Sequence, residues 1–328
     1  MTVKIVTDSS SDIPHDVARE LGITVVPLYV TFGTVNYKDG VDITPDEFFQ
    51  RLQNDPVHPT TSAASPGDFH DVYNKLSKDA DEIISIHLSK RVSATWDAAM
   101  RGRDLMEGTN CRIEVIDSRL TTMALGLISM AAANAARAGK NMQNIIDNIN
   151  NMIPRMRLYG VLDTLKYIVK GGRLGKIHPI FSSILPIKPL LVMKDGTIMP
   201  TGVVRTKSKG IDHLVDMVKS TLHIREIGIS HSSADEEVKA FCEKVKSILP
   251  DIKPTVAKLG PALGVHGGPG AFLVALQQDV SETVTAGEKE HKLSVQLPSL
   301  QSIKESILQR KPHSGDSTNA CVSSPLIA

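Results

Sequence analysis

The sequence has few of the residues on which several classes of protein depend. Its three cysteines, Cys111, Cys242 and Cys321, are spaced neither as a zinc motif nor as a disulfide framework. Aromatic residues make up only 4% of the chain, and 37 basic residues are nearly balanced by 36 acidic ones. Since the chain lacks both a strong basic field and aromatic platforms for base stacking, we do not expect nucleic acid as its main partner.

No segment is apolar enough to be expected to cross a membrane. The most apolar long stretch, residues 122–139, contains Ser129, Asn134 and Arg137 among many alanines, which predicts a buried helix. The amino terminus leads straight into a strand-like pattern without the apolar run of a signal peptide. Because scarce cysteine is typical of a reducing compartment, we expect a cytoplasmic protein without a transmembrane segment.

The familiar catalytic motifs are missing as well. The sequence contains no GxGxxG or GxxxxGK[ST] nucleotide-binding loop, no GxSxG nucleophile turn and no HExxH zinc motif. Asp8 follows the first strand as a phosphotransferase aspartate would, but Ser10 stands where the second aspartate belongs. We therefore expect no cofactor, no metal and no catalytic residue, and hence a protein that is not itself an enzyme.

What the chain does contain predicts an α/β protein. Hydrophobic residues make up 41%, enough for a sizeable core, and a length of 328 residues suggests two domains. In the first half, strand-like and helix-like segments alternate, which predicts crossover connections and a mainly parallel sheet. The expected strands are Val3–Val6, Ile23–Val30, Ile83–Leu88 and Ile113–Ile116.

Local signals mark several turns and helix starts. Thr44 before Pro45, and Ser65 before Pro66, are typical helix caps. A helix is expected from Val92 to Met106. The segment Tyr37–Val41 contains an Asp-Gly pair and predicts a hairpin.

The second half predicts a mixed sheet. A strand is expected at Leu158–Leu162, a hairpin around Asp195-Gly196, and further strands and helices alternate beyond it. We expect an amino-terminal α/β domain over residues 1–152, a carboxyl-terminal α/β domain over residues 153–283, and a polar, partly disordered tail over residues 284–328.

Hydroxyl-rich turns follow the strands of the first half, where ligands bind in open α/β sheets. Hydroxyls and the free N–H groups at helix starts can bind an anionic oxygen, but Ser and Thr at these positions are also ordinary helix caps. Taken singly, each turn fits capping better, whereas together they favour a site. The turns are Asp8–Ser11, Pro59–Gly67, Leu88–Thr95 and Asp117–Ser118.

Two segments of the second half carry a denser signal. Gly171-Gly172-Arg173 fits either a close backbone approach with an arginine clamp for an anion, or a helix-ending glycine with a solvated arginine. His266 lies in a loop of four glycines, where a binding role and a structural role are equally plausible. Arg205 ends the expected hairpin.

In combination, these segments resemble the DegV family, whose better-understood members are the fatty-acid-binding subunits of bacterial fatty acid kinase. The resemblance runs from about Lys4 to Leu276 and includes the motifs Thr-Asp-Ser at position 7, Thr-Thr-Ser at position 60, Ser-Pro-Gly at position 65 and Gly-Gly-Arg at position 171. It implies the EDD fold, with two α/β domains and a long-chain fatty acid between or within them.

The resemblance also implies roles for individual residues. Thr61 and Ser93 would hold the fatty acid carboxylate, with Ser62 and His266 beside them. Arg173 and Arg205 would serve the acyl phosphate or the docking of the kinase. The remaining residues expected to line the site are Asp8, Ser9, Ser10, Thr95, Gly172 and Gly268. Family members often have threonine at the position of Gly267. This chain therefore lacks a hydroxyl beside His266 that those members have.

The free energy of burying methylene groups supports a ligand with a long apolar chain and a small polar head group. Burying the roughly 14 methylenes of a palmitoyl chain contributes about 11 kcal/mol before the costs of ordering and association. We expect an elongated apolar channel that ends at Thr61 and Ser93. The small residues of the helix Thr121–Ala138 either leave room for this channel or allow close helix–sheet packing.

The resulting hypothesis is a lipid-binding protein that presents a fatty acid carboxylate to a separate ATP-dependent kinase, giving bound acyl phosphate. Two alternatives stay open: a lipid-storage or sensing module without a kinase partner, and a hydrolase that uses His266 with Asp8 or Asp117.

Overall fold

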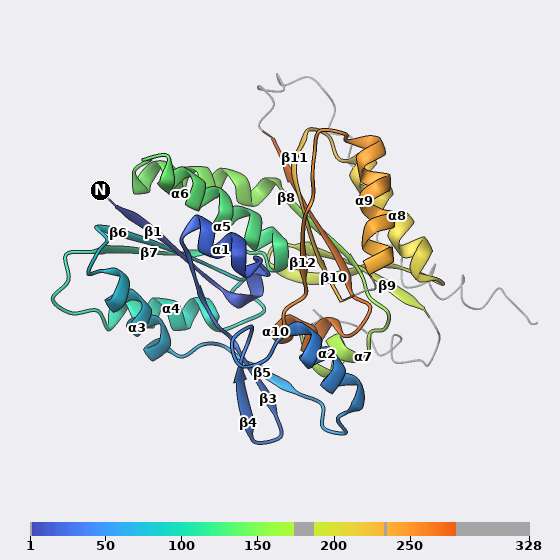
Figure 1. The fold of residues 1–328 in the computed structure, drawn as a ribbon, viewed down its shortest axis with the longest axis horizontal. Helices are drawn as coiled ribbons and strands as arrows, with labels where there is room; N and C mark the ends of the chain where they lie inside the picture. Colours follow the sequence, from blue (N-terminus) through green and yellow to red (C-terminus); the bar gives the residue numbers. More distant parts are fainter. Residues whose placement is uncertain (1, 174–186, 233–234, 280–328) are drawn as a thin grey trace, which may run out of the picture. The chain divides into compact units, whose positions relative to one another are not determined.

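The computed structural model describes residues 2–173, 187–232 and 235–279, drawn in colour in Figure 1. Its amino-terminal half contains a four-stranded parallel sheet in the order β2-β1-β6-β7, as the alternating pattern predicted. These strands are β1 (Val3–Asp8), β2 (Ile23–Val26), β6 (Glu82–His87) and β7 (Arg112–Asp117).

Helices cover both faces of this sheet, because successive residues of a strand point to opposite sides. Val6 and Ile83 pack with α3 and α4, whereas Ile5 and Ile84 pack with α1, α5 and α6. Ser65 caps α3 as expected, with a full capping box to Asp68. These helices are α1 (His15–Leu21), α3 (Pro66–Leu76), α4 (Thr95–Asp104), α5 (Thr122–Arg137) and α6 (Met142–Met152).

A small antiparallel sheet corrects two expectations. The segment Ile23–Val30 is not one strand, because it is interrupted at Pro27, which has no N–H to donate to a ladder. Its second part starts a sheet in the order β4-β3-β5, and the hairpin turn lies at Gly33-Thr34 rather than at Asp39-Gly40. The strands are β3 (Tyr29–Phe32), β4 (Val35–Lys38) and β5 (Thr60–Ser62), and helix α2 (Pro45–Asn54) lies between β4 and β5 in the chain.

The second half contains the expected mixed sheet, in the order β10-β9-β8-β13-β11-β12, with β11 and β12 parallel. The hairpin at Asp195-Gly196 is confirmed, and both residues have positive φ. Helices α8 and α9 pack on one face of this sheet. The elements are β8 (Met156–Val161), β9 (Lys188–Lys194), β10 (Thr197–Val204), β11 (Ile224–His231), β12 (Thr255–Lys258), β13 (Phe272–Gln278), α8 (Lys207–Ser220) and α9 (Asp235–Ile248).

Helix α5 lies between the two large sheets, so the two halves share one core (Figure 1). A Cβ added to Gly126 would lie 2.6 Å from the carbonyl oxygen of Ser11, and one added to Gly228 would lie 2.7 Å from Cβ of Met123. At these two glycines the helix and the sheets pack closely, whereas the room for a channel that its alanines could leave stays a prediction.

Around the expected domain boundary at residue 152, the chain ends α6 and continues as the short helix η2 (Ile153–Arg155). The division into domains at residue 152 stays a prediction, and the expected tail over residues 284–328 lies outside the described residues. Within the part of the chain that the structure describes, no helix is long and apolar enough to cross a membrane.

Three short helices place the candidate site. They are η1 (Ser9–Ser11), α7 (Lys166–Lys170) and α10 (Pro261–Gly267). Although α10 belongs to the second half of the chain, it contacts α2, β3, β5 and η1 of the first half as well as α7 (Figure 1).

Candidate functional site

A hydrogen bond between the two halves of the chain marks the centre of the candidate site. Thr61 lies on β5, where it pairs with Val30 of β3, and His266 lies near the end of α10. The Oγ1 atom of Thr61 is 3.0 Å from Nε2 of His266. Two residues that the sequence singled out separately are therefore brought into direct contact by the tertiary fold.

His266 is held as a neutral imidazole. Burial lowers its pKa to about 4, with further lowering by the positive charge of Arg173 and by His58. Its Nδ1 atom is buried, has no hydrogen-bond partner among the described residues, and faces Gly171, where any Cβ would collide with the ring. The absence of a side chain at Gly171 is therefore what admits the imidazole, which fits the close backbone approach proposed for the Gly-Gly pair.

Arg173 connects this pair to the loop that carries Ser93. Its Nε donates to the carbonyl oxygen of Val92 at 3.0 Å, and its Nη1 donates to the carbonyl oxygen of Gly171 at 2.9 Å. Among the described residues these bonds use two of the five N–H donors of the guanidinium, so donors remain for an anionic ligand.

Ser93 has a local partner in the structure. Its Oγ lies 2.8 Å from Oγ1 of Thr95 and accepts a bond from the Thr95 N–H at 3.2 Å. Thr95 is the first residue of α4 and is fully buried. Ser93 thus bonds locally to the first residue of α4, although the N-cap of this helix is Ala94 and has no side-chain cap bond, and the contact of Ser93 with a carboxylate stays a prediction.

Other predicted residues do not converge on the Thr61–His266 pair. Ser62 is exposed and, as the next residue along β5, points to the opposite face from Thr61. Arg205 is exposed after β10, and the described residues give it no bond to the pair. Gly172 has a φ of +64° directly after α7, which supports a helix-ending role.

Gly268 supports the site through packing. Its φ is +70°, and a Cβ there would collide with the ring of Tyr167 on α7. Gly267 is also confined, since a Cβ there would lie 3.0 Å from Leu259 and 3.3 Å from Ala271. Glycine at position 267 therefore allows α10 to pack closely against Leu259 and Ala271, which belong to the second half of the chain.

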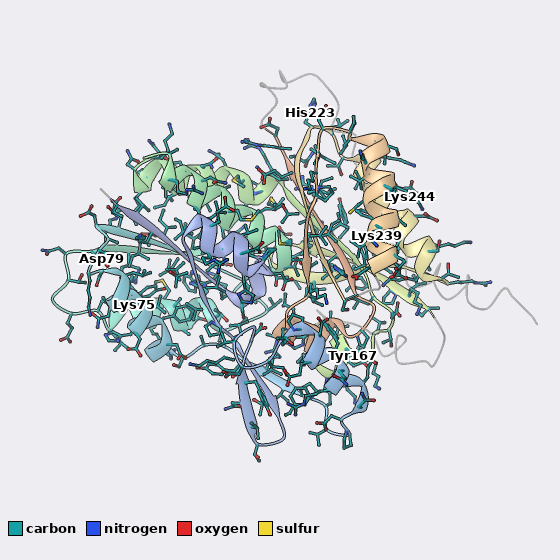
Figure 2. The ribbon with its side chains drawn as sticks, in the orientation of Figure 1. Lys75, Asp79, Tyr167, His223, Lys239 and Lys244 are labelled. Atoms are coloured by element: carbon teal, nitrogen blue, oxygen red, sulfur yellow. The ribbon has the colours of Figure 1, made fainter. Side chains whose placement is uncertain are left out.

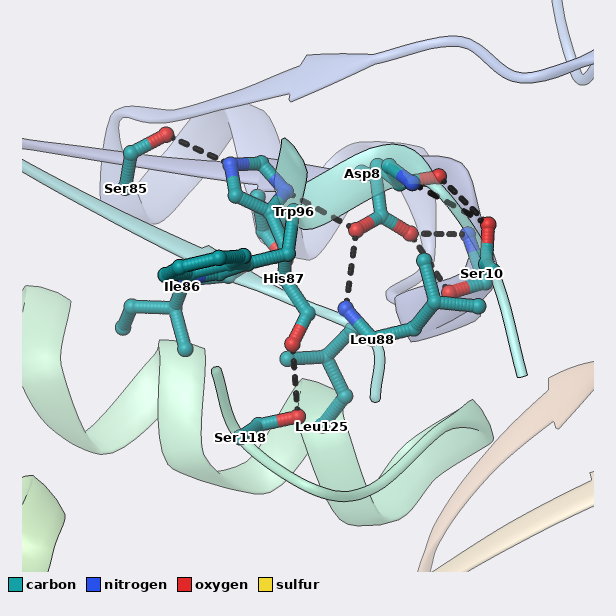
Figure 3. A network of polar contacts seen from close by, with 12 residues as sticks. Asp8, Ser10, Ser85, Ile86, His87, Leu88, Trp96, Ser118 and Leu125 are labelled. Carbon is teal, nitrogen blue, oxygen red and sulfur yellow. Dashed lines mark hydrogen bonds and ion pairs between the residues drawn. The ribbon is translucent and has the colours of Figure 1, made fainter. Parts of the chain in front are cut away.

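Asp8 and Ser10 belong to a separate network (Figure 3). The fully buried Asp8 carboxylate accepts bonds from Ser10 N at 3.1 Å and Leu88 N at 3.1 Å, and its Oδ2 lies 2.9 Å from Nδ1 of His87. The other ring nitrogen of His87 lies 2.7 Å from Oγ of Ser85. Because these interior contacts account for Asp8 and Ser10 without a ligand, the structure gives their predicted site-lining role no support.

The two carboxylates of the hydrolase alternative, Asp8 and Asp117, also have other hydrogen-bond partners. Asp8 is bonded within the network of Figure 3, and Asp117 accepts bonds from the backbone N–H groups of Lys90 and Arg119 at 3.3 and 2.9 Å. Neither carboxylate is hydrogen-bonded to His266 among the described residues. The third predicted residue of the first turn, Ser9, donates to Asp39 at 2.8 Å.

Sequence reasoning missed His58 and Tyr167. The two rings lie 5.9 Å apart between centroids, and His58 is close enough to His266 to lower the pKa of that residue. Burial lowers the pKa of His58 too, helped by Lys170 and Lys166. Tyr167 is labelled in Figure 2. The position of His58 shortly before the Thr-Thr-Ser motif was the only signal in the sequence.

Two surface hollows lie elsewhere. One of about 340 Å³ is lined by residues of α8 and α9, including Asp212 and Lys244. The other, of about 310 Å³, lies between α5 and the start of β11, beside Asn134 and Glu226. Neither is lined by Thr61 or Ser93, so the acyl channel expected from the sequence is not confirmed among the described residues, and residues 174–186 after Arg173 lie outside them.

Comparison with known proteins identifies the family. A family model described as the uncharacterised DegV family matches residues 2–279. The chain belongs to the DegV family. A DegV domain-containing protein of Caldanaerobacter subterraneus is 37% identical over 279 residues, covering 84% of this chain and 99% of that protein. One from Lactococcus lactis is 36% identical over 290 residues, covering 85% of this chain and all of that protein.

Solved structures of DegV proteins share the fold. A DegV family protein from Thermus thermophilus, described as binding fatty acid, superposes with a TM-score of 0.78 at 28% identity, covering 85% of this chain and 100% of that chain. DegV from Bacillus subtilis, described as a fatty acid binding protein, gives 0.78 at 26% identity over the same shares. A stearic-acid-binding protein from Eubacterium ventriosum gives 0.77 at 25% identity, covering 84% and 98%.

Proposed function

We propose that this DegV protein binds a long-chain fatty acid and holds its carboxylate beside Thr61 and His266. The observation that carries the proposal is the Thr61–His266 hydrogen bond of 3.0 Å, with Arg173 close enough to lower the pKa of the imidazole. The descriptions of the solved relatives as fatty acid binding proteins support the same ligand class.

The chemistry of this pair suits a carboxylate. When Nε2–H of the neutral imidazole donates to Oγ1 of Thr61, the Thr61 hydroxyl proton stays available to a carboxylate, without the desolvation cost of an isolated buried ammonium group. Arg173 supplies positive charge from the exposed rim, where its guanidinium stays hydrated. We assign the second hydroxyl to Ser93, because Arg173 donates a hydrogen bond to the carbonyl oxygen of Val92, the residue before Ser93.

The surroundings of α10 suit an acyl chain. One hydrophobic cluster, with Phe48, Ala262 and Val265, lies along α10, and a second cluster with Leu259 and Ala271 flanks it. Phe49 packs against both clusters. An acyl chain that enters between them would bury its methylenes against side chains that are already apolar.

We further propose that the bound carboxyl group is presented to a separate ATP-dependent kinase, giving a bound acyl phosphate. The exposure of Arg173 supports this step, because a phosphoryl group would add negative charge at the rim of the site and a guanidinium can bind it through two parallel hydrogen bonds. Arg205, which is exposed after β10, is the candidate for contact with the kinase.

Native mass spectrometry tests the proposal directly. Protein that has been stripped of lipid and then incubated with palmitate should gain the mass of one fatty acid. Failure to gain any lipid, in protein whose circular dichroism shows it to be folded, would contradict fatty acid binding. If lipid binds but a bacterial fatty acid kinase with ATP leaves its mass unchanged, the kinase step is wrong and a storage or sensing role is favoured.

A further inference from the structure

A buried carboxylate joins the start of α10 to the first half of the chain. Asp39, 4% exposed, follows β4, and its Oδ2 accepts bonds from the Ala262 N–H at 3.3 Å and from the Ser9 hydroxyl at 2.8 Å. Beside it, Oδ1 of Asp12 accepts a bond from the Gly260 N–H at 2.9 Å. A Cβ at Gly260 would lie 3.2 Å from Asp12 and 3.3 Å from Asp39, so the backbone approaches both carboxylates closely.

The same carboxylate is tied to the strand pair that carries Thr61. The Asp39 N–H donates to the carbonyl oxygen of Leu28 at 2.9 Å, and the Leu28 N–H donates to Oγ of Ser9 at 3.0 Å. Leu28 directly precedes β3, whose Val30 pairs with Thr61. Asp39 thus connects to Thr61 through the small sheet on one side.

On the other side Asp39 connects to His266 through α10. His266 lies four residues, about one helical turn, after Ala262. The helix packs closely against Phe48 at Gly264, and because α10 has only seven residues, Ala262 and His266 lie on consecutive turns of one short element. Asp39 is therefore connected to His266 through Ala262 and to Thr61 through the small sheet. His266 and Thr61 are in turn hydrogen-bonded to each other.

We infer that Asp39 is a positioning residue for the head-group site: its bonds to Ala262 and Ser9 set where His266 meets Thr61. The inference rests on the proposed function for its consequence in ligand binding, but its geometric part concerns the protein without ligand. Nothing in the short α10 itself supplies this placement, because the helix starts with Pro261 and has no side-chain cap.

Charged neighbours of Asp39 define its state. Burial raises the pKa of Asp39 to about 6, opposed by the bonds from Ser9 and Ala262 and assisted by the charge of Asp8. Burial raises the pKa of Asp12 to about 8, with contributions from Asp39 and Asp8. The bonds from Ser9 and Ala262 thus favour the ionised form of Asp39, whereas burial favours the protonated form of Asp12 more strongly.

The test measures His266 and the ligand separately. The pKa of His266 is followed by NMR in the protein without ligand, and palmitate affinity by calorimetry, for Asp39→Ala, Asp39→Asn and Asp46→Ala. Asp46 is the matched control, because it is exposed on α2 and also bridges the halves through Lys258 at 2.5 Å. Among the described residues, its side chain bonds to Lys258, which is not on the path.

In Asp39→Ala we expect the pKa of His266 to rise toward its ordinary value, because the imidazole gains solvent when α10 is released, and palmitate to bind about tenfold more weakly. Loss of the Asp39 charge alone would lower that pKa, so the direction separates displacement from simple electrostatics. Asp39→Asn, which keeps an oxygen acceptor, should restore both values to near wild type, and Asp46→Ala should change neither.

Each outcome decides one of the two proposals. An unchanged pKa of His266 in Asp39→Ala, or an equal change in Asp46→Ala, overturns the positioning role. If Asp39→Ala does not fold, Ser9→Ala removes the hydroxyl that bonds Asp39 and should shift the pKa in the same direction by less, while no shift overturns the role. If wild type takes up no palmitate but the shifts occur, the positioning role stands and the fatty acid proposal fails.

Discussion

At the scale of single residues, the candidate site consists of two uncharged side chains, Thr61 and His266, beside the exposed positive charge of Arg173. Thr61 and His266 share one hydrogen bond, and the imidazole stays unprotonated at neutral pH because it is buried near Arg173. An arriving carboxylate would reverse part of this effect, since a negative charge next to a histidine favours its protonated form. The residues proposed to contact the carboxylate are therefore different from Arg173, whose charge lowers the pKa of His266.

Thr61→Ala should weaken palmitate binding by about 1–3 kcal/mol, because it removes a hydrogen-bond donor from a partly buried site. Ser93→Ala should act in the same direction. Calorimetric titration of lipid-free protein measures both. Thr34→Ala is the control, since Thr34 is exposed in the hairpin turn of the same small sheet. Unchanged affinity in both site variants would place the head group elsewhere.

Asp12→Asn should make the protein more stable at alkaline pH than wild type. The folded state holds the Asp12 proton up to about pH 8, against an ordinary value of 3.8, so folded protein binds more protons than unfolded protein between these values. The stability that Asp12 contributes is present below about pH 4 and is lost as the pH rises through about 8, at about 1.4 kcal/mol per pKa unit.

Urea denaturation across that pH range measures this prediction. The advantage of Asp12→Asn over wild type should grow with pH. Asparagine suits the position because it keeps an acceptor for the Gly260 N–H and tolerates the φ of 52° found there. A stability difference that does not change with pH would show that Asp12 titrates normally.

At the scale of elements, two short helices and their glycines form the site. Helix α7 presents Tyr167 to Gly268, and the end of α10 presents His266 to Gly171. Glycine here provides room for a neighbouring ring as well as conformational freedom. Glycines inside the regular elements make room in the same way, since a Cβ at Gly102 of α4 would lie 2.6 Å from Cβ of Phe69 and a Cβ at Gly210 of α8 would lie 2.5 Å from Val161. Exposed positions need no such room: Lys239 and Lys244, labelled in Figure 2, lie on the exposed face of α9.

Gly268→Ala should destabilise the protein by about 1–3 kcal/mol more than Gly33→Ala, because the methyl group would collide with Tyr167 and force repacking. Both glycines have positive φ, 70° and 61°, but Gly33 has no atom within 4 Å of an added Cβ. Because Gly268 also has a ψ of 179°, a conformation that only glycine readily adopts, the comparison measures the steric contact together with this backbone strain. Thermal unfolding measures it, and equal losses in the two variants would mean that Tyr167 yields without cost.

At the scale of the whole described chain, α5 joins the two large sheets into one core. Its first turns contain buried residues throughout, and the same cluster includes Ile5 of β1 and Ala275 of β13. The two halves have separate sheets but not separate interiors. The candidate site has the same character, since Thr61 and His266 come from different halves.

A fragment of residues 1–152 should therefore fail to unfold cooperatively. Removing the second half would expose the face of α5 that packs against Leu158 and Ala275, which takes apolar surface from the core. Urea denaturation followed by circular dichroism tests this, with full-length protein as the reference. A cooperative transition in the fragment would show that the domain division expected from the sequence is also a division of stability.

Sequence patterns predicted the elements well where local chemistry decides them. The cap at Ser65, the hairpin at Asp195-Gly196 and the parallel sheet depend on neighbours within a few residues or on simple alternation. The pattern failed at Ile23–Val30, where Pro27 divides one apolar run between two sheets. Both parts are apolar, so composition could not reveal the change of sheet.

By itself, the sequence determined the family, the α/β class and the residue types of the site, because motifs and periodicity are properties of neighbouring positions. Only the tertiary structure decided that Thr61 meets His266, that His58 joins them, and that Asp8 turns inward instead. Hydrogen-bond partners far apart in the chain are selected by packing of the whole core, and no local pattern encodes that choice.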